Sequence, residues 1–483
     1  MYHRHRHAIT LAVLPLLLGA CATQQNAVLL PTLDISESTR FSVMASDEAS
    51  MLATRWWGSF DSPALQEIIN KVIAGNTDLT AMTLQIQQSR LELAVAGAAR
   101  QPVVTGGLSA SAASAPSIGD GSRETSRAYD LNTGISWEAD LWGRLANSNQ
   151  AAAARLLATQ ADADAFINAT IAQTIRSVIG VAFDQRQIEA TKRIIKNRSD
   201  SLAIVKDRYR SGVESTSVAT VSAAEETLAA ARADLPVQQL SLIKSANQLS
   251  LLAGEIPRSD TSMAASYAKV LPASVTSFTG LTLSPLDLLE RRPDVRAAHA
   301  RLNAANANIA VSLAERFPRL TLGGLLRSSA DGLDMLLDLD NLALSLTTDI
   351  MATLFDGGRA QRQSEIRRAE AEAVAAQYVG TVLTALTEVE NTINAELLLT
   401  RQSRFMRKRL TAARKTTEIT TERYRSGFAT YLSLLDASRS EALAQTAWLN
   451  VERSRWLNRV DLLLALGGLR PNALPGKEMS NAS

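Results

Sequence analysis

The segment Arg208-Tyr209-Arg210-Ser211-Gly212 recurs as Arg423-Tyr424-Arg425-Ser426-Gly427, 215 residues further along the chain. Another landmark shares this spacing, because Gly143-Arg144 is repeated as Gly358-Arg359 at an offset of 215. Several landmarks at one offset indicate that the chain is built twice from one plan. The period is too long for a solenoid, so we expect two homologous halves within one fold.

Each copy of the segment predicts a helix, a tight turn and a second helix. Gly212 and Gly427 can adopt the left-handed backbone that ends a helix. Arginines would then occupy the last helical turn, where cations suit the exposed carbonyl groups. Ser215 and Thr430 can cap the helices that follow. The alternative interpretation is a surface turn with no further role.

Residues 1–20 have the pattern of an export signal. A charged start with Arg4 and Arg6 precedes an apolar run over 8–18, which is too short to span a bilayer as a mature helix. The run ends in Leu18-Gly19-Ala20-Cys21, which resembles a bacterial lipoprotein lipobox and implies lipidation of Cys21. Ala22, and not an aspartate, follows the cysteine, and in enteric lipoproteins that pattern goes with outer-membrane sorting. The alternative is an ordinary signal with a cysteine by chance.

Charge and composition exclude several classes of function. The 50 basic and 48 acidic residues give a formal net charge of +2, and removing Arg4 and Arg6 leaves a neutral chain. Nothing therefore predicts a nucleic-acid partner. Three of the four histidines lie in the leader, and His299 remains alone, so we expect no metal site and no cofactor beyond the lipid on Cys21. No catalytic motif is present, and we expect no enzyme.

Two long helices are predicted by uninterrupted helical patterns. Residues 145–209 contain no proline and only Gly180, and residues 360–424 contain only Gly380. At 1.5 Å per residue, about 60 residues make a rod of roughly 90 Å. Rods of this length indicate a coiled-coil or tube architecture rather than a compact globule.

Four segments have the alternation of strands. They lie at about 103–115, 128–141, 319–328 and 341–354. One apolar and one polar face over about 9–13 residues is typical of a transmembrane β-barrel, although a soluble sandwich is the alternative. Four strands cannot close a barrel, and lipid tolerates no open sheet edge, so we expect several copies to share one barrel. Segments 117–126 and 330–340 would be its outward loops.

Four further motifs are Trp56-Trp57-Gly58-Ser59-Phe60, Trp137-Glu138-Ala139-Asp140-Leu141-Trp142-Gly143-Arg144, Arg291-Arg292-Pro293-Asp294-Val295 and Leu354-Phe355-Asp356-Gly357-Gly358-Arg359. Together these motifs resemble the TolC-like outer-membrane factor family, and in particular the lipidated outer-membrane subunits of resistance-nodulation-division efflux pumps. The resemblance implies a mainly α fold with a membrane β-barrel. Three chains would supply four strands each to a 12-stranded barrel that continues into a long periplasmic α-helical tube.

The expected domain organisation follows the two repeats. A signal peptide at 1–20 precedes an N-terminal lipid-anchored and equatorial segment at 21–62, and repeat 1 at 63–254 turns at 208–213. An equatorial linker at 255–285 leads to repeat 2 at 286–467, which turns at 423–428, and to a tail at 468–483. The resemblance implies that the equatorial segments lie around the middle of the tube and form short helices and strands.

The resemblance also implies roles for the two turns, as docking tips for a periplasmic adaptor (membrane fusion) protein. The docking residues would be Arg208, Arg210, Ser211, Gly212, Val213, Arg423, Arg425, Ser426, Gly427 and Phe428. The periplasmic gate would use Leu432, Asp436 and Tyr424, with three Asp436 carboxylates forming an acidic ring and three Leu432 side chains an apolar ring. The alternative for Asp436 is an exposed acid paired with Arg439.

The chain departs from the TolC-type pattern at three gate positions. Ala429 occupies the position of a latch arginine, and Ser433 replaces a second constriction aspartate. Val218 occupies the position of a latch aspartate in the first half. A leucine-and-aspartate closure is therefore expected in place of a polar latch.

The expected function is a passive outer-membrane exit channel for small toxic compounds or drugs, lipid-anchored and extending into the periplasm. It would work as a homotrimer with a periplasmic adaptor, an inner-membrane efflux pump and outer-membrane lipids. The alternatives are a type I protein-secretion duct or a structural coiled-coil or adaptor lipoprotein. The four amphipathic strands disfavour the last of these.

Overall fold

The computed structural model describes residues 28, 41–42, 56–116, 123–213, 216–257, 270–271, 282–283 and 291–468. The predicted signal peptide, Cys21 and most of the predicted 21–62, 255–285 and 468–483 segments lie outside the described residues. Contacts divide the chain into two compact units. One comprises residues 1–33, 85–160 and 297–380, and the other comprises 34–84, 161–296 and 381–483. Each unit takes segments from both sequence repeats, because the long helices run through both units.

The duplication is visible in matched helix lengths. Helices α3 (Thr77–Ala98) and α8 (Pro293–Ala314) have 22 residues each, and α4 (Arg144–Arg210) and α9 (Arg359–Arg425) have 67 each. Helices α5 (Val218–Leu252) and α10 (Tyr431–Ala465) have 35 each. Proline-free stretches with few glycines explain why α4 and α9 continue without a break.

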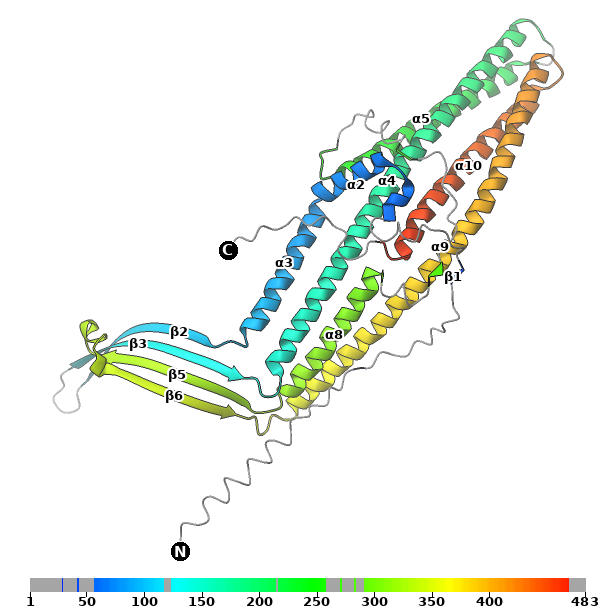
Figure 1. The fold of residues 1–483 in the computed structure, drawn as a ribbon. Helices are drawn as coiled ribbons and strands as arrows, with labels where there is room; N and C mark the ends of the chain where they lie inside the picture. Colours follow the sequence, from blue (N-terminus) through cyan, green and yellow to red (C-terminus); the bar gives the residue numbers. More distant parts are fainter. Residues whose placement is uncertain are drawn as a thin grey trace. The chain divides into compact units, whose positions relative to one another are not determined.

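The first unit contains a four-stranded antiparallel sheet in the order β2-β3-β5-β6 (Figure 1). Its strands are β2 (Val103–Pro116), β3 (Arg123–Ala139), β5 (Arg319–Ala330) and β6 (Leu342–Met351). The register places Leu108 opposite Leu131, Thr133 opposite Leu326, and Leu326 opposite Leu344. The alternating apolar residues of all four strands therefore share one continuous face.

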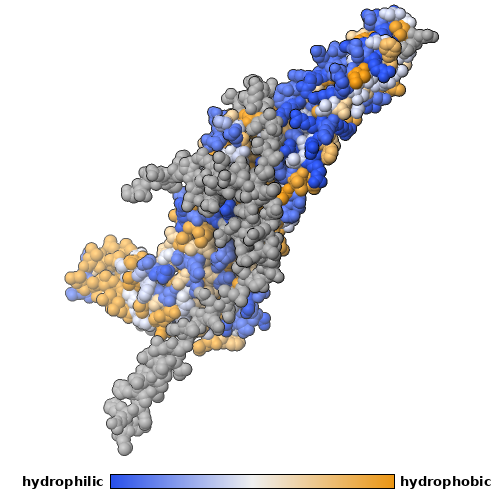
Figure 2. Space-filling model, turned by 45° about the vertical axis from the view of Figure 1, so that its right-hand side comes forward, coloured by the Kyte–Doolittle hydropathy of each residue, from blue (hydrophilic) through white to orange (hydrophobic). Residues whose placement is uncertain are grey.

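The other face of the sheet is polar. It carries the ion pair between Arg327 of β5 and Asp130 of β3, whose Nη2 and Oδ1 atoms lie 2.5 Å apart. On the apolar face, by contrast, the hydrophobic side chains are exposed in the single chain. The surface over the strands is accordingly orange (Figure 2). Every residue of β6 is exposed in the single chain. A sheet with one solvated face and one bare apolar face is the arrangement of a membrane barrel wall.

The start of β3 and both predicted loops differ most from expectation, whereas the other strand ends lie within three residues of the predicted bounds. Strand β3 begins at Arg123, so only residues 117–122, which lie outside the described residues, separate it from β2. The polar start of β3 does not alternate, which explains why the pattern missed it. The predicted 330–340 loop contains two single-turn helices, Leu333–Met335 and Leu339–Asn341.

Motif residues join the sheet to the helices within this unit. Trp142 stacks on Phe317 with 4.8 Å between ring centroids, and its indole Nε1 donates to the carbonyl of Pro318 over 2.7 Å. Arg144 donates two hydrogen bonds to the Glu138 carboxylate. Asp140 accepts from the amides of Leu145 and Ala146 at the start of α4. The tryptophan-rich motif therefore anchors the junction between strand and helix.

The second unit has a helical core. Helix α2 (Pro63–Gly75) and the single turn Trp56–Phe60 pack on α4 and α10, where Phe60 stacks on Trp456 with 6.0 Å between centroids. The apolar part of α4 lies in this core, including Ile171, Ile175 and Val178. By length and composition α4 could cross a membrane, with an 18-residue window of mean hydropathy 1.3, but 72% of that window is buried. It is a core helix.

A second described sheet is small. Phe41–Ser42 (β1) pairs antiparallel with Thr282–Leu283 (β4), so the segments predicted to be equatorial meet here. Arg292 of the Arg-Arg-Pro-Asp motif is buried, pairs with Asp294 and Glu388, and donates to the carbonyl of Ala465. Both features lie in the second unit: the small sheet joins the two segments predicted to be equatorial, and Arg292 joins the start of α8 to α9 and α10 within repeat 2.

Candidate functional site

The two helix hairpins of the second unit turn at the same end of that unit (Figure 1). One hairpin is α4 and α5, and the other is α9 and α10. Helix α4 ends when Gly212 donates to the carbonyl of Tyr209, and Val213 donates to that of Arg208, both over 3.1 Å. This bond pair is the Schellman motif, which requires a left-handed residue after the helix. Gly212 has φ +69°, as that geometry demands.

The second turn repeats this geometry. Gly427, with φ +85°, donates to the carbonyl of Tyr424 over 3.1 Å, and Phe428 donates to that of Arg423 over 2.8 Å. A side chain built on either glycine would meet open space, so the requirement for glycine is conformational rather than steric. The repeated pentapeptide is therefore a repeated helix stop.

The turns differ in length by two residues. Ser217 caps α5, with its hydroxyl accepting from the Thr220 amide, whereas Thr430 caps α10 and accepts from the Ser433 amide. The predicted cap Ser215 is thus wrong; it lies outside the described residues, and the helix begins two residues later than the 215-residue offset implies. Val218 consequently matches Tyr431 in helix position and not Ser433.

Tyr424 lies inside a small apolar cluster between the hairpins. Its side chain is 3% exposed and packs with Val205 of α4, Ala224 of α5 and Leu434 of α10. Its hydroxyl is buried with no hydrogen-bond partner among the described residues. Burial raises the pKa of this phenol, and the nearby Arg208 guanidinium opposes the rise. The ring fills the centre of the tip region.

Arg208 links the two hairpins directly. Its Nη1 donates to the backbone carbonyl of Tyr424 over 2.6 Å, and its guanidinium carbon lies 4.7 Å from the centroid of the Tyr424 ring. A cation over an aromatic face is attracted to the ring, and a charge-assisted hydrogen bond adds to that attraction. One guanidinium thus holds both the backbone and the side chain of the opposite tip.

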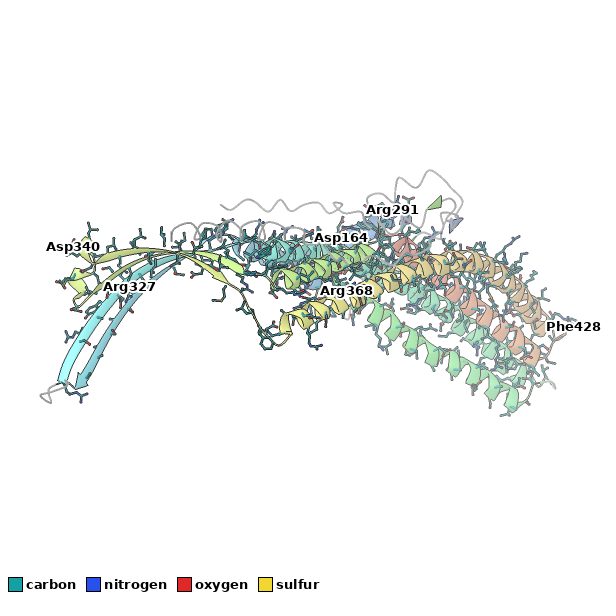
Figure 3. All side chains as sticks on the ribbon, turned by 90° about the horizontal axis from the view of Figure 1, so that it is seen from below. Asp164, Arg291, Arg327, Asp340, Arg368 and Phe428 are labelled. Carbon is teal, nitrogen blue, oxygen red and sulfur yellow. The ribbon has the colours of Figure 1, made fainter. Side chains whose placement is uncertain are left out.

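The two copies of the pentapeptide are not equivalent in the fold. Tyr209, the counterpart of Tyr424, is 45% exposed, and Arg423, the counterpart of Arg208, is also exposed. Phe428 is 77% exposed at the turn between α9 and α10, where it projects from the end of the hairpin (Figure 3). The first tip supplies the clamp and the second supplies the clamped residue.

The remaining predicted docking residues lie on the surface of the turns. Those exposed are Arg210, Ser211, Gly212, Arg425, Ser426 and Gly427, whereas Val213 is half-buried. Arg425 pairs with Glu422 over 3.8 Å. The structure therefore brings the predicted docking residues together at one end of the helices.

Leu432 and Asp436 share one exposed face in the first turns of α10. Leu432 is 66% exposed, and Asp436, four residues on, is exposed beside it. No ion pair joins Asp436 to Arg439 in the part of the chain that the structure describes. The pairing considered from the sequence is therefore not made, and both side chains stay available within a single chain.

The departures from the TolC-type pattern have local roles. Ala429 packs against the Tyr424 cluster, and the Ser433 hydroxyl lies 3.0 Å from the Thr430 hydroxyl at the cap. Neither provides a charge that could reach the other hairpin. Arg208 is predicted as a docking residue, and its contact with Tyr424 is not predicted, because nothing in either segment alone indicates that the two residues meet.

A four-stranded amphipathic sheet combined with paired helix hairpins defines the class of duplicated outer-membrane channel proteins. The outer membrane efflux protein family matches residues 68–255 and 285–468, and the chain belongs to this family. The mainly α fold with four strands per chain, predicted from the sequence, is confirmed. The chain is an outer-membrane efflux channel protein, as the recognised resemblance implied.

Individual relatives extend over nearly the whole chain. The pyoverdine export outer membrane protein OpmQ of Pseudomonas putida is 29% identical over 478 residues, which cover 95% of this chain and 97% of that protein. The probable outer membrane lipoprotein SilC of Salmonella typhimurium is 26% identical over 86% of this chain and 88% of its own. The solved outer-membrane channel OprN is 26% identical, with a TM-score of 0.78 over 91% of this chain and 99% of that chain.

Proposed function

We propose that this chain is the outer-membrane exit duct of a tripartite efflux assembly and that it works as a homotrimer. The observation that carries the trimer is the sheet order, which leaves β2 and β6 as edges without a strand partner in the described chain. Lipid provides no hydrogen-bonding groups for such edges. Edge β6 of one copy pairing with β2 of the next satisfies both, and three copies give the twelve strands that family resemblance implies.

In this proposal the energy for transport is supplied by partner proteins and not by the chain itself. The chain offers a polar sheet face and hairpin tips, which suit a passive path with a docking end. The partners are a periplasmic adaptor at the tips and an inner-membrane efflux pump behind it, and the cargo is small toxic compounds or drugs. The exposed tip residues, Phe428 foremost, support docking because an exposed aromatic side chain is a common anchor at protein interfaces.

The closed state rests on the tips. Leu432 and Asp436 narrow the path as apolar and acidic rings, and Tyr424 fixes the second hairpin against the first through Arg208. The distance of 4.7 Å between the Arg208 guanidinium and the Tyr424 ring supports a clamp made by ring and cation. This arrangement replaces the polar latch that Ala429, Ser433 and Val218 cannot form.

Covalent lipid on Cys21 anchors the chain to the outer membrane. The lipobox-like segment and the lipoprotein relative support this assignment. Acyl chains contribute about 0.8 kcal/mol per buried methylene, so two or more chains hold firmly. Mass spectrometry of the mature N-terminus tests it: an acylated Cys21 supports the anchor, and an unmodified cysteine removes it.

Native mass spectrometry of the detergent-solubilised protein tests the trimer. We expect a species of three mature chains and no stable monomer with an intact sheet. A folded, detergent-stable monomer or dimer would contradict the shared barrel.

A further inference from the structure

Helix α9 carries a basic segment that the channel function does not use. Between Thr400 and Thr416 it contains seven arginines and lysines and no acidic residue. Like charges at spacings of three and four residues repel one another along a helix. A segment of this composition is stabilised by a compensating anion.

Part of this segment lines a groove of about 720 Å³. Arg404, Arg407, Lys408 and Lys415 line it from α9, and Arg455 lines it from α10. Every charged side chain of the lining is cationic. The α9 residues follow spacings of three, four and seven, so they lie on one helix face over about 16 Å.

The groove keeps most of its charge. Lys415 pairs with Glu418, and Arg455 pairs with Glu452. Arg404, Arg407 and Lys408 form no ion pair within the described ranges. Five cations facing two acids leave a net charge near three, which is the condition for binding an anion.

Arg455 adds an independent sign of a ligand. It is 9% exposed, and its Nε has no hydrogen-bond partner among the described residues, although its Nη1 lies 3.2 Å from Glu452. A buried charged donor that makes no hydrogen bond costs folding free energy. Such donors are therefore normally paired with an acceptor. Arg455 also lines the groove, so an anion held there lies beside this guanidinium.

The acids of helix α5, if a second copy presented that helix, are a poorer match. Helix α5 carries Glu225, Glu226 and Asp234 in its described length, and Glu225 is already paired with Lys206 over 2.6 Å. Two remaining acids, eight residues apart, do not balance a continuous basic face. A mobile small molecule with several negative groups fits the groove better.

We propose that this groove binds small molecules that carry two or more carboxylate or phosphate groups. The proposal rests on the efflux function for its meaning, since such anions would be cargo of the channel. Guanidinium groups suit both carboxylate and phosphate because they donate two parallel hydrogen bonds.

Isothermal titration of the detergent-solubilised full-length protein with citrate, and separately with pyrophosphate, tests the site at low ionic strength. The variant carries Arg404→Gln and Lys408→Gln. The control carries Arg401→Gln and Arg409→Gln, which remove equal charge from exposed α9 positions outside the groove. We expect at least tenfold weaker binding for the variant and a change below twofold for the control.

Each outcome decides the proposal. Binding of citrate alone, pyrophosphate alone or both supports it and identifies the anionic group. An equal loss of affinity in the variant and the control overturns the proposal, and so does an absence of binding to the wild type. If the wild type does not bind and the variant also loses the trimer, a second copy fills the groove. Conductance of the same preparations reports separately on the channel, so failure of the site and failure of the proposed function are distinguishable.

Discussion

The guanidinium of Arg208 lies over the ring of Tyr424, 4.7 Å from its centroid, and donates to the Tyr424 carbonyl over 2.6 Å. The two residues are 216 positions apart and come from different repeats. A duplicated turn has thus become an asymmetric pair, in which one tip holds the other.

Replacing Arg208 with alanine should loosen the hairpins. A charge-assisted hydrogen bond and a cation over a ring together contribute roughly 2 kcal/mol, which corresponds to about a 30-fold change in the ratio of closed to open tips. Single-channel recording should show a higher open probability.

Two variants sharpen this test. Arg208→Lys keeps the charge but loses the planar group, so it should fall between alanine and the wild type. Arg210→Ala, an exposed change in the same turn, should leave the open probability unchanged. Equal effects of Arg208→Ala and Arg210→Ala would reject the clamp.

Tyr424→Phe distinguishes a ring clamp from a hydroxyl latch. The hydroxyl is buried without a partner in the described chain, so removing it should leave stability unchanged or raise it slightly. Tyr424→Ala should cost about 3–5 kcal/mol by emptying the cluster. Thermal unfolding measures both, and a phenylalanine variant that opens the channel would favour the hydroxyl latch.

Alkaline pH should weaken the tip. Burial raises the pKa of Tyr424 in the folded state above its ordinary value, so the neutral phenol stabilises the fold. That stability is fully present below the unfolded pKa of about 10 and is lost as pH rises through the folded pKa. The Tyr424→Phe variant should lose this part of the pH dependence, and an unchanged alkaline profile would contradict the assignment.

The turn glycines should resist substitution for conformational reasons. Gly427→Ala places a Cβ at φ +85° in open space, with a cost of about 1 kcal/mol. Gly427→Asn should cost less, because asparagine tolerates this backbone. Thermal unfolding measures the order, and equal costs for both would reject the conformational argument.

A bulky charged residue at Gly212 or Gly427 tests docking separately. Each should block binding of the adaptor while sparing the trimer, because a side chain there meets open space within the chain. Pull-down of the adaptor with size-exclusion chromatography of the variant measures both properties. Normal adaptor binding would remove the docking role.

The helices, the strands and the helix ends could be predicted from local patterns in the sequence. The 67-residue helices follow from long stretches without proline, and the strands follow from alternation with one apolar face. The helix stops follow from glycine after an arginine-rich turn. These features depend on neighbouring residues alone.

Other features depend on contacts that no single segment encodes. Ser215, Thr216 and Ser217 could each cap α5 by residue type, and in the structure Ser217 does so, through a capping box with Thr220. The Arg208–Tyr424 contact requires two hairpins to be brought together by the core. The start of β3 at Arg123 is polar and shows no alternation. This segment is a strand because it pairs with β2.

Planar-bilayer recording of the wild type and of the double variant Leu432→Ala and Asp436→Ala tests the central claim most directly. We predict a low-conductance, mostly closed channel for the wild type and a higher conductance for the variant, because both rings at the periplasmic end are removed. Leu443→Ala, on the same face of α10 but further from the tip, should behave as the wild type. Absence of channels in the wild type, or an unchanged conductance in the double variant, would contradict a channel closed at its paired tips.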